Sequence, residues 1–177
     1  MHARLAFALI GISLFAAPAV HAQQAPAAPA AIPDAMPFDI PYGTPITLEQ
    51  AQKAITAAAA EANKRKWRMS IAVVDPSGNL IAHATLDGTQ YASIPISQAK
   101  ARAAAGLRRP SKVLQDVINS GTPSLLSLLP LFGGAASEGG LPIVVDGKLI
   151  GAIGVSGGLS VQDGVIAKAG LDAITTQ

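Results

Sequence analysis

Residues 139–163 read GGLPIVVDGKLIGAIGVSGGLSVQD, and this stretch decides the fold. Two apolar runs, 141–145 and 149–155, flank an Asp-Gly dipeptide, which is one of the strongest local signals for a β-hairpin. Glycines then form a second turn, and Ser160 begins a helical pattern with Asp163 at its third helical position, where a carboxylate suits the positive end of a helix. The stretch therefore predicts a hairpin, a glycine turn and a final helix, whose buried face is expected to hold Val161, Val165, Ile166 and Ala169.

The residues upstream of this stretch add a helix, a strand pair and two more helices. Thr47 has Gln50 three residues on, a capping box that starts the first helix, and 69–74 and 80–86 read as strands joined by a Pro-Ser-Gly turn. Two helices are expected at 96–106 and 112–119, the second capped by Ser111. Because tight turns join both strand pairs, the sheet should be largely antiparallel. The order predicts one α+β domain, residues 46–177, with helices flanking the sheet.

The N-terminal residues have the composition of an export signal and a tether. Residues 1–22 place Arg4 before a short apolar run and end at an A-x-A-like cleavage site before Gln23. An uncleaved membrane anchor is the alternative, although the run is short for a membrane span. Residues 23–45 are rich in proline and alanine, which favours an extended spacer or a docking strip for a partner. We therefore expect a periplasmic or secreted protein.

Composition and charge exclude several classes of function. The chain has no cysteine, so it has no disulfide, no thiolate metal site and no cysteine nucleophile. Its formal net charge is only +2, which gives no case for binding nucleic acid. The apolar segment 125–131 favours burial against another subunit, and we expect a homo-oligomer.

A serine-hydrolase motif occurs between residues 154 and 158, where GVSGG matches G-x-S-x-G with Ser156 at its centre. In that hydrolase fold the base histidine follows the serine, whereas no histidine follows His83 in this chain. We therefore interpret the glycines as a tight strand-to-helix turn. The backbone N–H groups of that turn could instead bind an anion, unless Asp163 already caps the helix.

His83 is the one histidine outside the expected signal, and it lies in an apolar strand. One imidazole suffices as an axial ligand for haem iron, so His83 is a candidate metal ligand, and a hydrogen-bonded strand histidine is the alternative. Basic residues near the first helix end, 64–68, indicate either an anion site or a solvated helix terminus. The cations available for haem propionates are Lys100, Arg102, Arg108 and Arg109.

Four stretches resemble the GlcG/HbpS family, also called the haem-degrading or DUF336-type domain. These are LEQAQKAITAAAAEA, IAVVDPSGNLIAHATLDG, SQAKARAA and above all GGLPIVVDGKLIGAIGVSGGLSVQDGVIAKAGL. The resemblance implies a profilin-like fold assembled into dimers or larger rings such as octamers. The family includes an extracellular haem-binding protein that works with a two-component sensor, and proteins encoded beside glycolate oxidation genes.

The resemblance implies an exported haem-binding protein that stores, relays or slowly degrades haem, and we expect a binding protein rather than an enzyme. The alternatives are a module that binds a 2-hydroxy acid or another small carboxylate, and an accessory protein of a membrane sensor. The shared pattern also includes Gly88, Gly154 and Gly158. The predicted ligand-binding residues are His83, Asp87, Lys100, Glu138, Gly139, Gly140, Ser156, Gly157 and Asp163.

Overall fold

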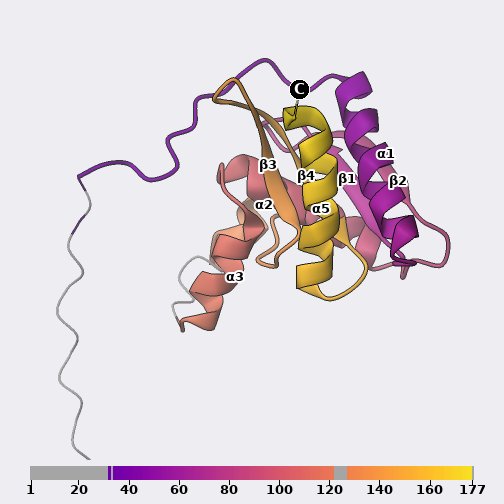
Figure 1. The fold of residues 1–177 in the computed structure, drawn as a ribbon. Coiled ribbons are helices and arrows are strands. Elements are labelled where there is room, and N and C mark those ends of the chain that lie inside the picture. Colours follow the sequence, from indigo (N-terminus) through magenta and orange to yellow (C-terminus); the bar gives the residue numbers. More distant parts are fainter. Residues whose placement is uncertain (1–31, 33, 122–126, 177) are drawn as a thin grey trace, which may run out of the picture. The chain divides into compact units, whose positions relative to one another are not determined.

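A four-stranded antiparallel sheet forms the centre of the domain, with strand order β2-β1-β4-β3 (Figure 1). The computed structural model describes residues 32, 34–121 and 127–176, and the unit that contains the sheet begins at Ala35. The strands are β1 (Ser70–Val74), β2 (Leu80–Thr85), β3 (Gly140–Val145) and β4 (Lys148–Ser156).

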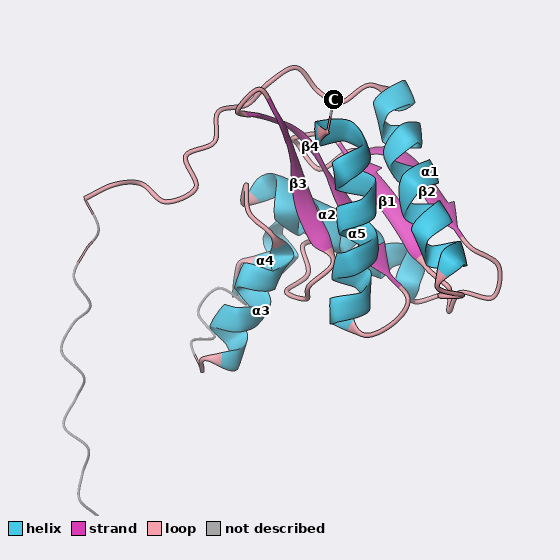
Figure 2. Cartoon of the chain, in the orientation of Figure 1, coloured by secondary structure: helices cyan, strands magenta, loops and turns pink. Residues whose placement is uncertain are grey.

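Helices cover both faces of this sheet. α1 (Leu48–Lys64) and α5 (Ser160–Thr175) lie on one face, and α2 (Ser93–Gly106) lies on the other (Figure 2). α3 (Ser111–Asn119) and the short α4 (Leu129–Phe132) follow α2 and pack beside it. This arrangement confirms the predicted α+β fold with an antiparallel sheet flanked by helices.

β1 is buried along its whole length because helices pack on both of its faces. Ile71 and Val73 belong to the main core, which they share with Ile153 of β4 and with alanines of α1. The alternate residues face α2, where Val74 and Ala152 pack against its alanines. Polar side chains that the sheet contributes to a site therefore have to lie at the ends of the strands or on the edge strand β2.

α2 lies directly on the backbone of the sheet because two glycines leave room for it. A Cβ atom at Gly154 would lie 2.1 Å from the carbonyl oxygen of Ser97, and one at Gly140 would lie 2.2 Å from that of Lys100. Such close approach of two backbones requires glycine. The contact places Lys100 of α2 against the beginning of β3 and near the last residues of β4.

The predicted turns and first cap are present. Val145 pairs with Lys148 across the hairpin, and Asp146 and Gly147 have φ values of 50° and 72°, as a type I′ turn requires. The Thr47 hydroxyl accepts the backbone N–H of Gln50, whose side chain accepts that of Thr47, so the capping box is confirmed.

Three local predictions were wrong. Val161 and Val165 were expected to be buried but are 57% and 41% exposed, whereas the expected burial of Ile166 is confirmed, because α5 turns Ile166 and four other residues to the interior. The buried residues of α5 are Asp163, Ile166, Ala167, Gly170 and Ile174.

Ser111 lies inside α3 rather than capping it, and its hydroxyl donates to the carbonyl oxygen of Ser137 and accepts the N–H of Gly140. Asp163 lies one residue further into α5 than predicted, because Leu159 occupies the N-cap.

Residues 38–46, which we call the N-terminal strap, contact the domain. Gly43 donates its N–H to the carbonyl of Leu149 at 2.9 Å, and Leu149 donates to Pro41 at 2.8 Å. The guanidinium of Arg109 lies 3.9 Å from the ring centre of Phe38, and that of Arg108 lies 5.5 Å from Tyr42. The strap therefore runs beside the start of β4, next to the point where β1 has ended.

The apolar segment 125–131 is described only in part, since residues 122–126 lie outside the described residues. Among the helices that the structure describes, none combines the length and the apolar character needed to cross a membrane.

Candidate functional site

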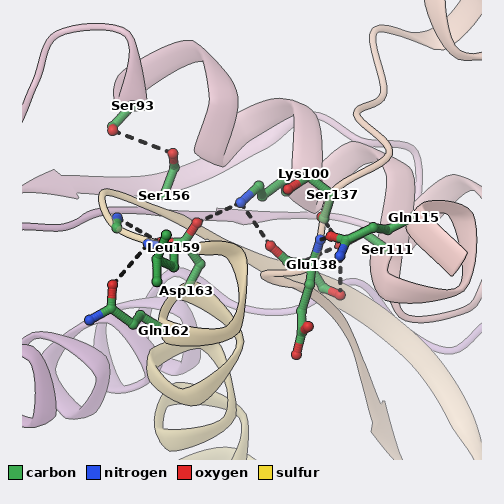
Figure 3. A network of polar contacts seen from close by, with 12 residues as sticks. Ser93, Lys100, Ser111, Gln115, Ser137, Glu138, Ser156, Leu159, Gln162 and Asp163 are labelled. Atoms are coloured by element: carbon green, nitrogen blue, oxygen red, sulfur yellow. Dashed lines mark hydrogen bonds and ion pairs between the residues drawn. The ribbon is translucent and has the colours of Figure 1, made fainter. Parts of the chain in front are cut away.

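Lys100 of α2 and Asp163 of α5 form an ion pair that is almost completely buried (Figure 3). The ammonium nitrogen lies 2.7 Å from a carboxylate oxygen, and both side chains are 3% exposed. Lys100 also donates to the carbonyl oxygen of Glu138 at 2.7 Å. Two charges withdrawn from water persist only when they are paired and hydrogen-bonded, and here both conditions are met.

Glycines at the end of β3 and after β4 close around this pair. Gly139 has φ of +124°, and a Cβ atom there would lie 3.1 Å from the Lys100 nitrogen. The N–H of Gly158 donates to the second carboxylate oxygen of Asp163 at 3.1 Å. Burial raises the pKa of Asp163, while Lys100 and the N–H groups of Gly158 and Gly157 act in the opposite direction.

The loop before β3 is attached to the same network from α3. Gln115 accepts the N–H of Glu138 at 2.8 Å, and Ser111 holds Ser137 and Gly140. The Glu138 carboxylate points away from Lys100 and lies over Gly164 of α5 (Figure 3). The structure thus brings together five of the predicted residues, Lys100, Glu138, Gly139, Gly140 and Asp163.

This network satisfies its own charges. The ammonium group and the turn N–H groups that were expected to bind a carboxylate ligand are bonded to the carboxylate of Asp163. Neither Lys100 nor Asp163 lines the clefts at the α1–β1 loop, at the N-terminal strap or at the β3–β4 hairpin. The geometry therefore supports a structural role, in which this network links α2, α5 and the loop before β3. It does not favour the binding of a small carboxylate ligand by these residues.

His83 lies elsewhere, on the face of β2 that continues the α2 side of the sheet. Its Nε2 is 2.9 Å from the hydroxyl of Ser70, which also lies 3.1 Å from Thr85 and 3.2 Å from Ser97. Burial lowers the pKa of His83, so the imidazole is held in its neutral form. A neutral imidazole whose Nε2–H donates to a hydroxyl has a free electron pair on Nδ1, which can bind a metal ion.

The Ser70–His83 contact is not the nucleophile and base of a hydrolase. Ser70 is 0% exposed, and its hydroxyl is shared with two further hydroxyls. Among the described residues, no carboxylate is hydrogen-bonded to His83. Ser156, the centre of the G-x-S-x-G match, is also buried and donates to Ser93 at 3.3 Å (Figure 3).

Asp87 and Gly157 border two open clefts at the basic run 64–68, where the sequence predicted either an anion site or a solvated helix end. Both clefts are lined by Lys66, Trp67 and Arg68, the loop between α1 and β1. The larger, of about 540 Å³, also touches Thr85, Leu86 and Asp87. The smaller, of about 290 Å³, touches Met69, Gly157, Gly158 and Gln162. The signal in the sequence was the basic run 64–68, with the only tryptophan of the chain inside it.

Within the described part of the chain, no three His, Asp or Glu side chains are grouped to hold a metal ion.

Comparison with known proteins gives the same family as the sequence stretches. The family described as haem-degrading protein HbpS-like matches residues 46–172. The chain is 41% identical to protein GlcG of Escherichia coli strain K12 over 111 residues, which cover 63% of this chain and 81% of GlcG.

Two solved structures share the fold. A crystal structure of a double mutant of Streptomyces reticuli HbpS has a TM-score of 0.68 and 31% identity, covering 82% of this chain and 99% of HbpS. A crystal structure of a PduOC:heme complex has a TM-score of 0.68 and 26% identity, covering 74% of this chain and 96% of PduOC. Since the family match spans most of the described domain and solved relatives share its architecture, the chain belongs to the HbpS-like family.

Proposed function

We propose that this chain is an exported haem-binding protein that stores or relays haem, with His83 as the axial ligand of the iron. The observation that carries the proposal is membership of the HbpS-like family together with the similarity to a protein crystallised with heme. Bound haem would supply an iron centre that accepts a nitrogen ligand at an axial position.

His83 fits the role of an axial ligand. Its imidazole is half-buried, it is held neutral by burial, and it lies on the edge strand β2, where a planar group can approach from the side. Ser70 fixes the ring through Nε2, and among the described residues Nδ1 has no hydrogen-bond partner. Fixing one nitrogen to orient the other is the usual arrangement of a metal-binding histidine.

A hemin titration of the protein purified from cells expressing the full chain tests the proposal. Absorbance is followed in the Soret region for the wild type and for His83→Ala, with Thr56→Ala, an exposed residue of α1 whose hydroxyl bonds only the carbonyl of Gln52, as the control. We expect a saturable Soret shift in the wild type and in Thr56→Ala. In His83→Ala the shift should be lost or moved to the spectrum of a weaker ligand.

Each other outcome has a definite meaning. A wild-type protein that gives no saturable shift overturns haem binding. An unchanged spectrum in His83→Ala overturns only the ligand assignment, and it makes Tyr91 or Tyr42, which are 89% and 58% exposed, the next residues to replace. In that case Tyr91→Phe and Tyr42→Phe, which remove only the hydroxyl group, should separate the two.

Export is the second part of the proposal and rests on the composition of residues 1–22. Mass spectrometry of the protein recovered from the periplasmic fraction of a Gram-negative host should find a chain that begins at Gln23. Full-length protein retained in the membrane fraction would indicate an uncleaved anchor instead.

A further inference from the structure

The loop between α1 and β1 presents two cations that the rest of the described chain does not neutralise. Lys66 and Arg68 are exposed, and no ion pair or side-chain hydrogen bond joins either of them to another described residue. The neighbouring cation Arg65 is different, because it is paired with Glu61. Lys66 and Arg68 are therefore the cations of this loop that remain available to an external anion.

The same two side chains border both clefts, with Trp67 between them in the sequence. Trp67 is half-buried against the main core, so its indole is a fixed apolar wall rather than a mobile surface group. The larger cleft, of about 540 Å³, is within the range of small-molecule sites. An apolar wall with cations at its rim is suited to a planar molecule that carries carboxylates.

The position of Arg68 is set by the loop that follows β2. A Cβ atom at Gly88 would lie 3.2 Å from Nε and from a terminal nitrogen of Arg68, so the guanidinium lies against this glycine. Gly88 has φ of +73°, a conformation that favours glycine in its own right. Asp87 lies on the same cleft, and its carboxylate opposes an anion there, so the two cations have to outweigh one negative charge.

This cleft adjoins the His83 side of the sheet. Thr85 lines the cleft, and its hydroxyl lies 3.1 Å from that of Ser70, which in turn contacts Nε2 of His83. A planar ligand held at His83 would reach the cleft by extending along β2 past Thr85. Lys66 and Arg68 line that cleft.

We propose that Lys66 and Arg68 bind the propionate carboxylates of haem, with Trp67 as the apolar wall beside them. This assignment rests on the proposed haem function and names the part of the chain that recognises the charged edge of the porphyrin. It places the carboxylate contacts on the α1–β1 loop, away from the buried Lys100 and away from Arg108 and Arg109, which are engaged by the N-terminal strap.

The test compares hemin with hemin dimethyl ester, whose propionates are uncharged, by Soret titration. The variant is Lys66→Gln/Arg68→Gln, and the matched control is Lys53→Gln/Lys148→Gln. The control removes two exposed cations that line neither cleft of the α1–β1 loop, so the change in net charge is the same. The cleft variant should bind hemin about tenfold more weakly, because each exposed ion pair between a propionate and a cation contributes only modestly to affinity.

The dimethyl ester separates a carboxylate contact from a general disturbance of the fold. The cleft variant and the wild type should bind the ester equally, and the control should bind both ligands like the wild type. Weaker binding of the ester as well would show a structural effect and overturn the assignment, as would equal hemin binding in all three proteins. If the wild type gives no saturable shift with hemin, the proposed function and this assignment fail together.

Discussion

Lys100 and Asp163 carry opposite charges that are both withdrawn from water, so each depends on the other. Replacing Asp163 by Asn should lower the free energy of unfolding by about 3–5 kcal/mol, because the Lys100 ammonium would lose its counter-ion inside the protein. Lys100→Met should have a similar effect. Urea denaturation followed by circular dichroism measures both changes.

The double variant Lys100→Met/Asp163→Leu distinguishes a structural pair from a binding site. Replacing a buried pair by apolar side chains is often neutral, so this variant should be more stable than either single variant. It should recover only in part, since the Glu138 carbonyl and the Gly158 N–H would lose their partners. A double variant less stable than both singles would contradict the assignment of a simple structural pair.

His83 makes stability depend on pH in a definite direction. Burial holds its folded pKa below the ordinary value of about 6.5, so the unfolded chain binds the proton first on acidification. The stabilisation is complete above about 6.5, and it is lost as the pH falls through the folded pKa. Between pH 7.5 and 5.0 the wild type should lose more stability than His83→Gln, as measured by urea midpoints. Equal losses would contradict the prediction.

The sequence indicated which residues lie together in the candidate site better than it indicated the role of each residue. Lys100, Gly139, Gly140 and Asp163 were predicted together and are found together. Lys100 was predicted to bind a ligand, but its ammonium group is bonded to Asp163, which lies 63 residues away in the sequence. Whether such a partner reaches Lys100 depends on the fold and could not be predicted from the sequence. His83 could not be placed in the same way, because its partner Ser70 is adjacent only through the register of β1 and β2.

The contact of α2 with the sheet depends on glycine. Gly154→Ala should lower stability by about 1–3 kcal/mol or more, because the new Cβ atom would lie 2.1 Å from the carbonyl oxygen of Ser97. Gly106→Ala is the matched control at the end of α2. There the nearest atom, in Phe132, is 3.7 Å away, so the change should be neutral or stabilise by about 0.5 kcal/mol. Thermal unfolding compares the two, and a Gly154→Ala protein as stable as the control would contradict this account.

Elements bounded by strong local signals were predicted closely. The hairpin between β3 and β4 has a turn that permits few alternatives, and the first helix begins at a capping box. The predicted buried face of α5 was right for Ile166 and wrong for Val161 and Val165, because apolar periodicity alone favoured these valines whereas the helix buries a carboxylate and a glycine. The cap assigned to Ser111 failed because its hydroxyl is used by the loop before β3, a contact over 26 residues.

The N-terminal strap should contribute more to the stability of the domain than its composition suggests. A chain that begins at residue 35 should keep the stability of the longer protein, since the strap begins at Phe38. A chain that begins at Ile46 should lose about 1–3 kcal/mol, because Gly43 and Pro41 each exchange a hydrogen bond with Leu149. Urea denaturation of the two truncated chains measures the difference, and equal stabilities would show that the strap is only a spacer.

Assembly into a homo-oligomer remains a prediction. The described end of the apolar segment exposes Leu128 at 46% and Leu131 at 81%, and large apolar side chains in that position favour contact with another subunit. Light scattering at micromolar concentration should find a multimer. Leu131→Glu should shift the multimer toward the monomer without lowering the thermal stability of the monomer. A wild-type protein that is monomeric would contradict the prediction.

The contact between α2 and the sheet also has a consequence for how the protein opens. At Gly140 and Gly154 the backbones of α2 and of the sheet meet with no side chain between them, so rotation of a side chain cannot open the contact there. We expect water to reach the buried amides of β1 and β4 from the α2 side when α2 separates from the sheet as a unit. Hydrogen exchange should therefore give the protected amides of α2, β1 and β4 one common, slow rate of opening, whereas those of α3 should exchange independently and faster.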